Sequence, residues 1–263
     1  MIKREFQIGF KSFIICMLIL VLMFLSVYLM YPWMMTEETI QSIDEMMEIF
    51  PPDVLKAFNM DMSSISTAYG WVKSEGFMYV LLTIGIYASI LGGSCLLKEE
   101  NEKTIEYLGS LPIKRSTILA NKVLVGFLYL FLMVLIFGIF NYIALLLSCE
   151  FDVKQFVLLS ITPILIAFPF YSIHLFLSTF LHQNQKLFGF SLGFVIVSYF
   201  FSVFSELSEN VEALKYFSIY TLADTRNVIS EITINPWMIL VSAILTIIFL
   251  IFSFIHYQKK EFF

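Results

Sequence analysis

The sequence predicts an all-α, polytopic membrane protein with six transmembrane helices. Of its 263 residues, 59% are hydrophobic and 14% are charged, whereas a soluble domain averages about 25% charged residues. The apolar residues fall into six long stretches separated by polar segments, and each stretch reaches or approaches the ~20 residues that a spanning helix needs. We therefore expect a single transmembrane domain over residues 1–263, embedded in a lipid bilayer. The net charge of −5 does not indicate a nucleic-acid partner.

The N-terminal segment, residues 1–11, is short and basic, and it carries Phe6 and Phe10 at helical spacing. This pattern predicts an interfacial helix that lies on the membrane surface. Residues 12–31 are predicted to form the first span, closed by aromatic residues at the interface. A signal peptide is the alternative, but the apolar run is too long for one and no A-x-A cleavage pattern follows it.

The other elements follow in order along the chain. Residues 34–74 form a polar, acidic outer loop in which two short helices are expected, the first ending at Pro51. Further spans are predicted at residues 77–97, 118–147, 156–181, 187–204 and 237–257. Pro163 and Pro169 should kink the fourth span, because proline removes a backbone donor. The outer loop 205–236 is partly apolar, which predicts that it re-enters the outer leaflet.

Positive charge is distributed unequally between the two sides of the predicted bundle. Eleven of the 16 Lys and Arg residues flank the spans on the side of the two termini, and five lie on the other side. Because Lys and Arg are enriched in cytoplasmic loops, we expect a multi-pass protein of the cell membrane with both termini cytoplasmic. Residues 98–117 then also lie in the cytoplasm, where ATP is available.

Residues 98–117 form the only long, densely charged segment between two spans that also carries a cluster of Lys and Arg. Ile105, Leu108 and Leu111 recur every third residue, which places them on one stripe of a short helix with the carboxylates on the rest of its surface. Pro112 ends this helix, because a proline moves the preceding residue out of helical geometry. The segment is predicted to be an amphipathic helix held at the membrane surface. A charged loop that only connects two spans is the alternative.

The run E-x-x-x-x-T-I-E-Y-L-x-S-L-P-I-x-R, followed by Lys122, resembles the loop after the second span of ABC-2 type exporter permeases. Lys103 and Gly109 depart from the family pattern, which commonly has Gly and Leu at these positions. In that family the segment is a coupling helix that docks on a separate ATPase subunit. The resemblance therefore implies an ATPase-coupling role for Glu99, Glu100, Glu102, Thr104, Glu106, Leu108, Leu111, Pro112 and Arg115.

The same resemblance implies a permease subunit of an ATP-driven exporter, in which two identical or paralogous permeases pair with two ABC ATPases. The chain has no G-x-x-x-x-G-K-[ST] motif, so ATP and Mg²⁺ would be bound by the partner ATPase. We expect no catalytic residue, cofactor or metal site in this chain. A second cytoplasmic contact is expected at His182, Gln183, Asn184 and Gln185. The acidic outer face, with Met46 and Met47, would suit a cationic or amphipathic peptide as the exported substrate, and the resemblance adds antimicrobial-type peptides and other toxic compounds.

Two features inside the predicted spans carry further hypotheses. His174 is an ionisable residue in the fourth span, where such groups are costly and often functional. It is a candidate for the transport pathway, or a neutral histidine bonded to a neighbouring helix. Gly189 and Gly193 form a G-x-x-x-G pattern in the fifth span, which permits close helix contact, either at a seam between two permease subunits or within one subunit. The alternative function is a stand-alone secondary transporter without an ATPase, although the sequence shows no internal repeat typical of that class.

Overall fold

The structure is a computed structural model that describes residues 2–34, 68–72, 76–101, 113–148, 151–181, 184–207, 209–225 and 232–260, together with a few isolated positions. Every regular element in these ranges is a helix, and six helical segments are long and apolar enough to cross a membrane. They are α1 (Ile2–Met34), α6 (Phe77–Asn101), α8 (Arg115–Ser148), α9 (Val153–Ile161) together with α10 (Ile164–Ser178), α11 (Asn184–Leu207) and α13 (Pro236–Lys259). The predicted fold class, all-α with six candidate spans, is confirmed.

Most of the outer loop 34–74, with its two expected helices, lies outside the described residues; the described part includes the short helix α5 (Ala68–Trp71). The first helix, α1, is continuous. The sequence suggested an interfacial segment at residues 1–11 followed by a separate span, but the structure has no break between them. A single glycine does not interrupt a helix, and Gly9 is packed so closely that a Cβ atom there would lie 2.6 Å from Cε2 of Tyr129.

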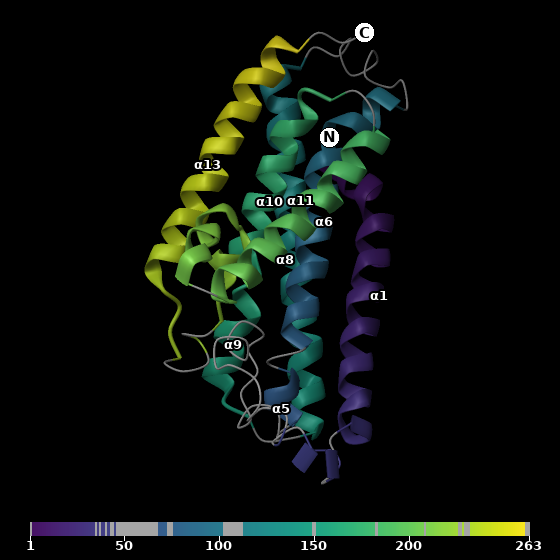
Figure 1. The fold of residues 1–263 in the computed structure, drawn as a ribbon. Coiled ribbons are helices and arrows are strands. Elements are labelled where there is room, and N and C mark those ends of the chain that lie inside the picture. Colours follow the sequence, from purple (N-terminus) through teal and green to yellow (C-terminus); the bar gives the residue numbers. More distant parts are fainter. Residues whose placement is uncertain are drawn as a thin grey trace.

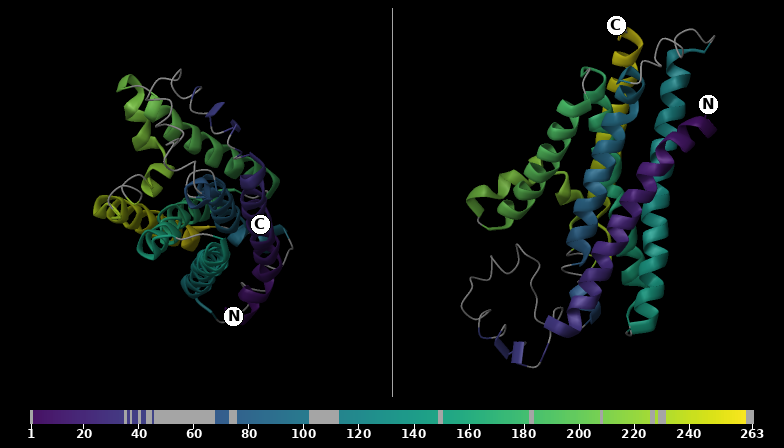
Figure 2. Two further views of the ribbon diagram at one scale, coloured as in Figure 1. Left: turned by 90° about the horizontal axis from the view of Figure 1, so that it is seen from below. Right: turned by 90° about the vertical axis from the view of Figure 1, so that its right-hand side faces the viewer.

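The centre of the bundle is α10, which packs against α6 on one side and α13 on the other, whereas α1 lies at the outside beside α8 and α6 (Figure 1; Figure 2). Glycine allows the close approach of α6, because a Cβ atom at Gly92 would lie 2.2 Å from the main-chain oxygen of Tyr171. Tyr171 itself is fully buried against Gly126 and Phe127 of α8. Between membrane helices such close contacts contribute through van der Waals packing, because lipid is as apolar as the side chains that it would otherwise solvate.

The fourth span is divided into α9 and α10 by a turn at Thr162 and Pro163. Proline cannot donate a backbone hydrogen bond, and Pro163 accordingly occupies the position just before the first residue of α10. The sequence predicted a kink at Pro163, and the structure has a turn there that separates two helices. Pro169 lies inside α10, which continues past it.

The outer loop 205–236 contains two 3₁₀ helices, η2 (Glu209–Phe217) and η3 (Tyr220–Ala223). The hydroxyl group of Ser218 donates to the main-chain oxygen of Ser198 in α11 at 2.6 Å, and the residues that follow it are mostly buried. In both figures the helices η2 and η3 lie level with the middle of the bundle rather than at its end (Figure 1; Figure 2). The segment enters the bundle. Two short 3₁₀ helices lie where the length and apolar residues of the loop suggested a re-entrant pair. On its exposed side, a hydrogen bond from Lys215 lowers the pKa of Glu212.

Candidate functional site

The segment predicted to contact an ATPase is flanked by α6, which ends at Asn101, and α8, which begins at Arg115. Of the predicted contact residues, Glu99 and Glu100 belong to the last turn of α6, and Arg115 starts α8. The others, Glu102, Thr104, Glu106, Leu108, Leu111 and Pro112, lie outside the described residues. Both flanks lie at the end of the bundle towards which the two chain termini point, called here the termini end (Figure 1; Figure 2).

The second predicted contact lies at the same end of the molecule, between α10 and α11 (Figure 1). His182 and Gln183 are outside the described residues, whereas Asn184 and Gln185 form the start of α11. The topology of the bundle therefore brings the described parts of both predicted contacts to the termini end.

Arg115 connects the start of α8 to the end of α13. Its Nη1 atom donates to the main-chain oxygen of Lys260 at 2.6 Å and to that of Gln258 at 3.4 Å. The last carbonyl groups of a helix have no partner within the helix, and a cationic side chain is favoured at this end of the helix dipole. Arg115 therefore caps α13 through a contact 145 residues away in sequence.

Lys260 in turn connects the end of α13 to the end of α10. Its side chain is buried, and its Nζ atom donates to the main-chain oxygens of Ser178 at 3.2 Å and Leu181 at 3.4 Å. These oxygens belong to the last residue of α10 and to the turn after it. A continuous path of hydrogen bonds, named here the C-terminal clamp, therefore runs from Arg115 through Lys260 to α10.

Lys122, less than two turns after the start of the clamp on α8, forms a buried ion pair with Glu5 of α1. Its Nζ atom lies 3.0 Å from Oε2 of Glu5 and 3.1 Å from the main-chain oxygen of Cys95 in α6. The side chains are only 3% and 10% exposed. Removing one member of such a pair leaves a buried charge without a partner and typically costs about 3–5 kcal/mol. The pair therefore fixes α8 to α1 and α6.

Two tyrosine hydroxyl groups reinforce the contact of α8 with its neighbours. Tyr129 of α8 donates to the main-chain oxygen of Phe6 in α1. Tyr171 of α10 donates to the main-chain oxygen of Lys122 at 3.4 Å. The sequence marked Lys122 as part of a motif, but it held no local signal for Glu5 or for either tyrosine, because these partners lie on other helices.

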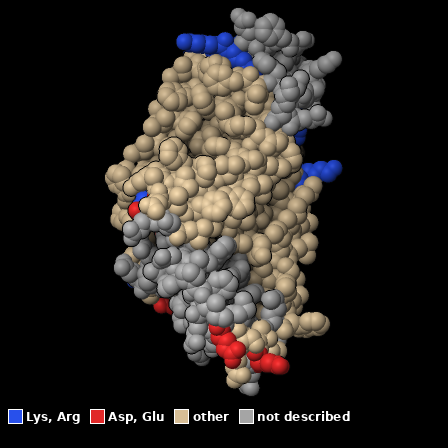
Figure 3. Space-filling model, viewed as in Figure 1, with Lys and Arg blue, Asp and Glu red and all other residues tan. Residues whose placement is uncertain are grey.

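Charged side chains are separated along the long axis of the molecule (Figure 3). On the face shown, Lys and Arg gather towards the termini end, and Asp and Glu lie mainly at the opposite end (Figure 3). Basic residues of the termini end include Lys3, Lys114 and Lys259, which are all exposed. The unequal distribution of Lys and Arg read from the sequence is thus also seen among the described residues of this face (Figure 3).

Comparison with known proteins agrees with this arrangement. A family model described as ABC-2 family transporter protein matches residues 2–262. The chain belongs to the ABC-2 transporter family. No curated protein shows a significant match to the sequence. Membrane subunits of the ABC-2 family are non-catalytic, typically bind no cofactor and generally partner with ABC ATPases, so this chain is a multi-pass, non-catalytic transport component.

In this ABC-2 protein, His174 lies in the interface between α10 and α11. Its side chain is fully buried, and Nδ1 lies 2.8 Å from the main-chain oxygen of Phe170, one turn earlier in α10. Its ring contacts Phe190 and Phe194 of α11, with 5.4 Å between the centroids of His174 and Phe194. Among the described residues Nε2 has no hydrogen-bond partner. The expected bond to a neighbouring helix is thus wrong: the bond stays within α10, and aromatic packing makes the contact with α11.

Gly189 and Gly193 lie on an exposed face of α11. A Cβ atom added at either position would meet no atom within 4 Å. Large apolar side chains follow on α11, and Ile196, Val197 and Phe200 are 46–48% exposed. In the described part of the ABC-2 chain, therefore, no helix packs closely against Gly189 and Gly193. Of the two interpretations of the G-x-x-x-G pattern, the one that places the contact within one subunit is not met there.

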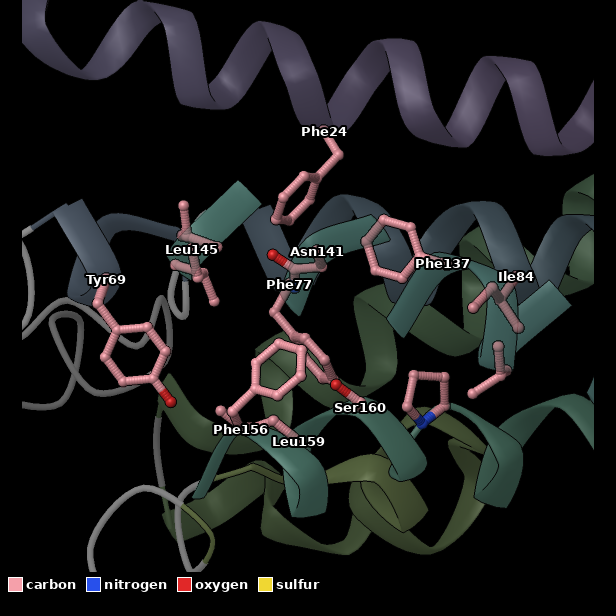
Figure 4. Close-up of a pocket in the computed structure, with 13 residues that line it drawn as sticks. Phe24, Tyr69, Phe77, Ile84, Phe137, Asn141, Leu145, Phe156, Leu159 and Ser160 are labelled. Carbon is pink, nitrogen blue, oxygen red and sulfur yellow. The ribbon is translucent and has the colours of Figure 1, made fainter. Parts of the chain in front are cut away.

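Figure 4 shows a small pocket of this ABC-2 protein lined by Phe24, Phe77, Phe137 and Phe156 from four different helices. Asn141 of α8 also lines it, is 8% exposed, and has an Oδ1 atom without a hydrogen-bond partner in the described part of the chain. The pocket holds about 20 Å³, enough for one water molecule and too little for an exported compound. We therefore treat it as a packing feature rather than a transport site.

Proposed function

We propose that this chain is the transmembrane subunit of an ATP-driven exporter, in which residues 98–117 transmit ATP hydrolysis by a separate ATPase subunit to the spans. The observation that carries the proposal is the set of anchors on the flank of this segment. Arg115 joins α8 to α13 and, through Lys260, to α10. Lys122 joins the same helix to α1 and α6.

These anchors give the coupling hypothesis a physical basis. Energetic coupling between distant sites is carried by packed side chains, hydrogen-bond networks and rigid secondary elements. A force applied to residues 102–112 by a moving ATPase would act directly on the first turn of α8. The C-terminal clamp and the Glu5–Lys122 pair would then carry the displacement to four further helices. Glu99, Glu100, Glu102, Thr104, Glu106, Leu108, Leu111 and Pro112 are proposed to form the docking surface together with Arg115.

The orientation of the chain follows from its charge. Because Lys and Arg are enriched on the cytoplasmic side of membrane proteins, we infer that the termini end faces the cytoplasm, with both termini inside the cell. This orientation would place residues 98–117, and the second proposed contact at His182, Gln183, Asn184 and Gln185, on the side that an ATPase can reach. Export is the proposed direction, and an amphipathic or antimicrobial-type peptide is the proposed substrate.

The proposed assembly contains two ATPases and two permease subunits, identical or paralogous. The exposed face at Gly189 and Gly193 supports a seam between permeases, because small residues without an intramolecular neighbour allow another helix to approach closely. The second candidate function, a stand-alone carrier, would depend on His174. The enclosure of His174 by Phe190 and Phe194 gives that function less support.

The test is affinity purification of the chain from native membranes in mild detergent. We expect a Walker-type ATPase to copurify stoichiometrically, and Glu106→Lys or deletion of residues 99–102 to release it. Glu212→Gln, on an exposed 3₁₀ helix away from the termini end, is the control and should retain the ATPase. Purification of the chain alone under several mild conditions would contradict the proposal. Loss of transport in His174→Leu with no ATPase present would then favour the carrier.

A further inference from the structure

A polar cavity lies beside the Glu5–Lys122 pair at the termini end of the bundle. It has a volume of about 100 Å³ and is enclosed by α1, α6, α8 and α10. Its polar lining comes from Glu5, Ser12, Ser94, Cys95, Lys98 and Lys122. The proposed coupling function uses the ion pair as an anchor but leaves this cavity without a role.

One carboxylate oxygen in the cavity wall has no donor. Oε2 of Glu5 accepts from Lys122, whereas Oε1 is buried and has no hydrogen-bond partner among the described residues. The Glu5 side chain is only 10% exposed, so bulk water does not solvate it freely. A buried carboxylate oxygen without a donor is costly. A hydrogen-bond donor in the cavity would satisfy this oxygen, and a cationic ligand would do so best.

The wall of the same cavity also carries a cationic side chain, which can bind an anionic group. Lys98 is half-buried, and its hydrogen bond to the main-chain oxygen of Ile8 in the described part of the chain is long, at 3.5 Å. Its ammonium group has three donors, so donors are left for a second acceptor. Ser12, an exposed residue with a hydroxyl group, lines the same cavity. An anionic oxygen acceptor, such as a phosphate, fits this half of the cavity.

We propose that the cavity binds a phosphoethanolamine-type zwitterion, with its ammonium group on Oε1 of Glu5 and its phosphate on Lys98 and Ser12. Membrane aminophospholipids present this headgroup at the surface of a bilayer. Beyond the cavity, α1 exposes Ile15, Leu18 and Leu22, which are 51%, 56% and 62% accessible. These apolar side chains would lie along acyl chains, which favours a lipid over the free headgroup. A bound lipid would join α1 to α6 next to the anchor at Lys122.

The proposal is tested by native mass spectrometry of the purified full chain with three phospholipids of equal chain length. Phosphatidylethanolamine should be retained roughly tenfold better than phosphatidylcholine, the order expected for one hydrogen bond to a charged group. The quaternary ammonium of phosphatidylcholine has no N–H group to donate to Glu5. Phosphatidylglycerol, which lacks a cation, should also bind weakly. Equal retention of the three lipids would overturn the proposal.

Two variants test which residue binds each half of the headgroup. Glu5→Gln should abolish the preference for phosphatidylethanolamine, and Lys98→Gln should weaken binding of all three lipids while leaving the Glu5–Lys122 pair intact. Glu212→Gln makes the same chemical change as Glu5→Gln outside the cavity and should retain the preference. If Glu5→Gln does not fold, an unchanged lipid profile in Lys98→Gln alone suffices to reject the proposal. Saturable binding of free O-phosphoethanolamine with no lipid retention would show that the ligand is not a lipid. The proposed contacts to the headgroup would then stand.

Discussion

The guanidinium group of Arg115 lies 2.6 Å from the main-chain oxygen of Lys260, so the first residue of α8 holds the last turn of α13. Lys260 repeats this arrangement one helix further on, where its ammonium group bonds the carbonyl groups at the end of α10. Two cations thus cap two helix ends in series. The clamp starts at Arg115, inside the segment 98–117 that is proposed to couple the ATPase to the spans.

Breaking the clamp should uncouple ATP hydrolysis from transport without dissociating the complex. In Lys260→Met the carbonyl groups at the end of α10 lose a donor, whereas the proposed ATPase-binding segment is untouched. We expect the ATPase to copurify as before and substrate-stimulated ATP hydrolysis to fall about fivefold or more, the lower range of typical coupling free energies. Arg115→Met should reduce stimulation at least as much, because Arg115 belongs both to the clamp and to the proposed docking surface.

Lys259→Met is the matched control, because Lys259 is an exposed neighbour on the last turn of α13. It should keep wild-type stimulation. Wild-type stimulation in both Lys260→Met and Arg115→Met would show that the clamp only stabilises the fold. Loss of the ATPase itself from Lys260→Met would also contradict the prediction.

The Glu5–Lys122 pair should show strong coupling in a double-mutant cycle. Glu5→Gln or Lys122→Met each leaves a buried polar or charged group without its partner, and each should lower the free energy of unfolding by about 3–5 kcal/mol. The double variant should cost clearly less than the two single changes together, because it leaves no uncompensated charge. Reversible unfolding in detergent, followed by circular dichroism, measures all four proteins.

The exposed pair of Glu212 and Lys215 provides the comparison for that cycle. Glu212→Gln should change stability little, because the pair is exposed and joins two residues of the same 3₁₀ helix, and exposed ion pairs contribute weakly. Additive effects of Glu5→Gln and Lys122→Met would mean that the two side chains do not interact in the membrane-embedded protein.

Two glycines should respond in opposite ways to a larger side chain. At Gly193 a Cβ atom meets nothing, so Gly193→Leu should leave the stability of the subunit unchanged and reduce the fraction of permease dimers. At Gly92 the Cβ atom would lie 2.2 Å from a main-chain oxygen, and Gly92→Leu should destabilise the subunit by roughly 1–3 kcal/mol or more. Light scattering in detergent and thermal unfolding separate these results. An unaltered dimer fraction in Gly193→Leu and Gly189→Leu would place the seam elsewhere.

Asn141 should be replaceable by an apolar residue of similar size. Its Oδ1 atom lacks a donor in the apolar pocket of Figure 4, and an unsatisfied buried group of this kind costs about 1–3 kcal/mol. Asn141→Leu should therefore keep the melting temperature or raise it. A fall in stability of about 1 kcal/mol or more would reveal that a bound water or another donor satisfies the amide in the native protein.

The sequence by itself determined the class of the protein, its six spans and the unequal distribution of positive charge. These are local properties: a run of about 20 apolar residues is sufficient for a span, and each basic residue is assigned to a side by counting spans. The break at Pro163 followed for the same reason, since a missing backbone donor acts on its own helix. The motif around Arg115 and Lys122 marked the segment of greatest interest.

Only the tertiary structure decided what those residues contact. Glu5 and Lys122 are 117 residues apart, and no spacing rule could pair them. Nor could the spacing distinguish Gly92, which touches a neighbouring backbone, from Gly193, which faces open space. His174 likewise bonds its own helix rather than a neighbour. Such contacts depend on how whole helices are rotated and crossed, and that geometry is set by the packing of many side chains at once.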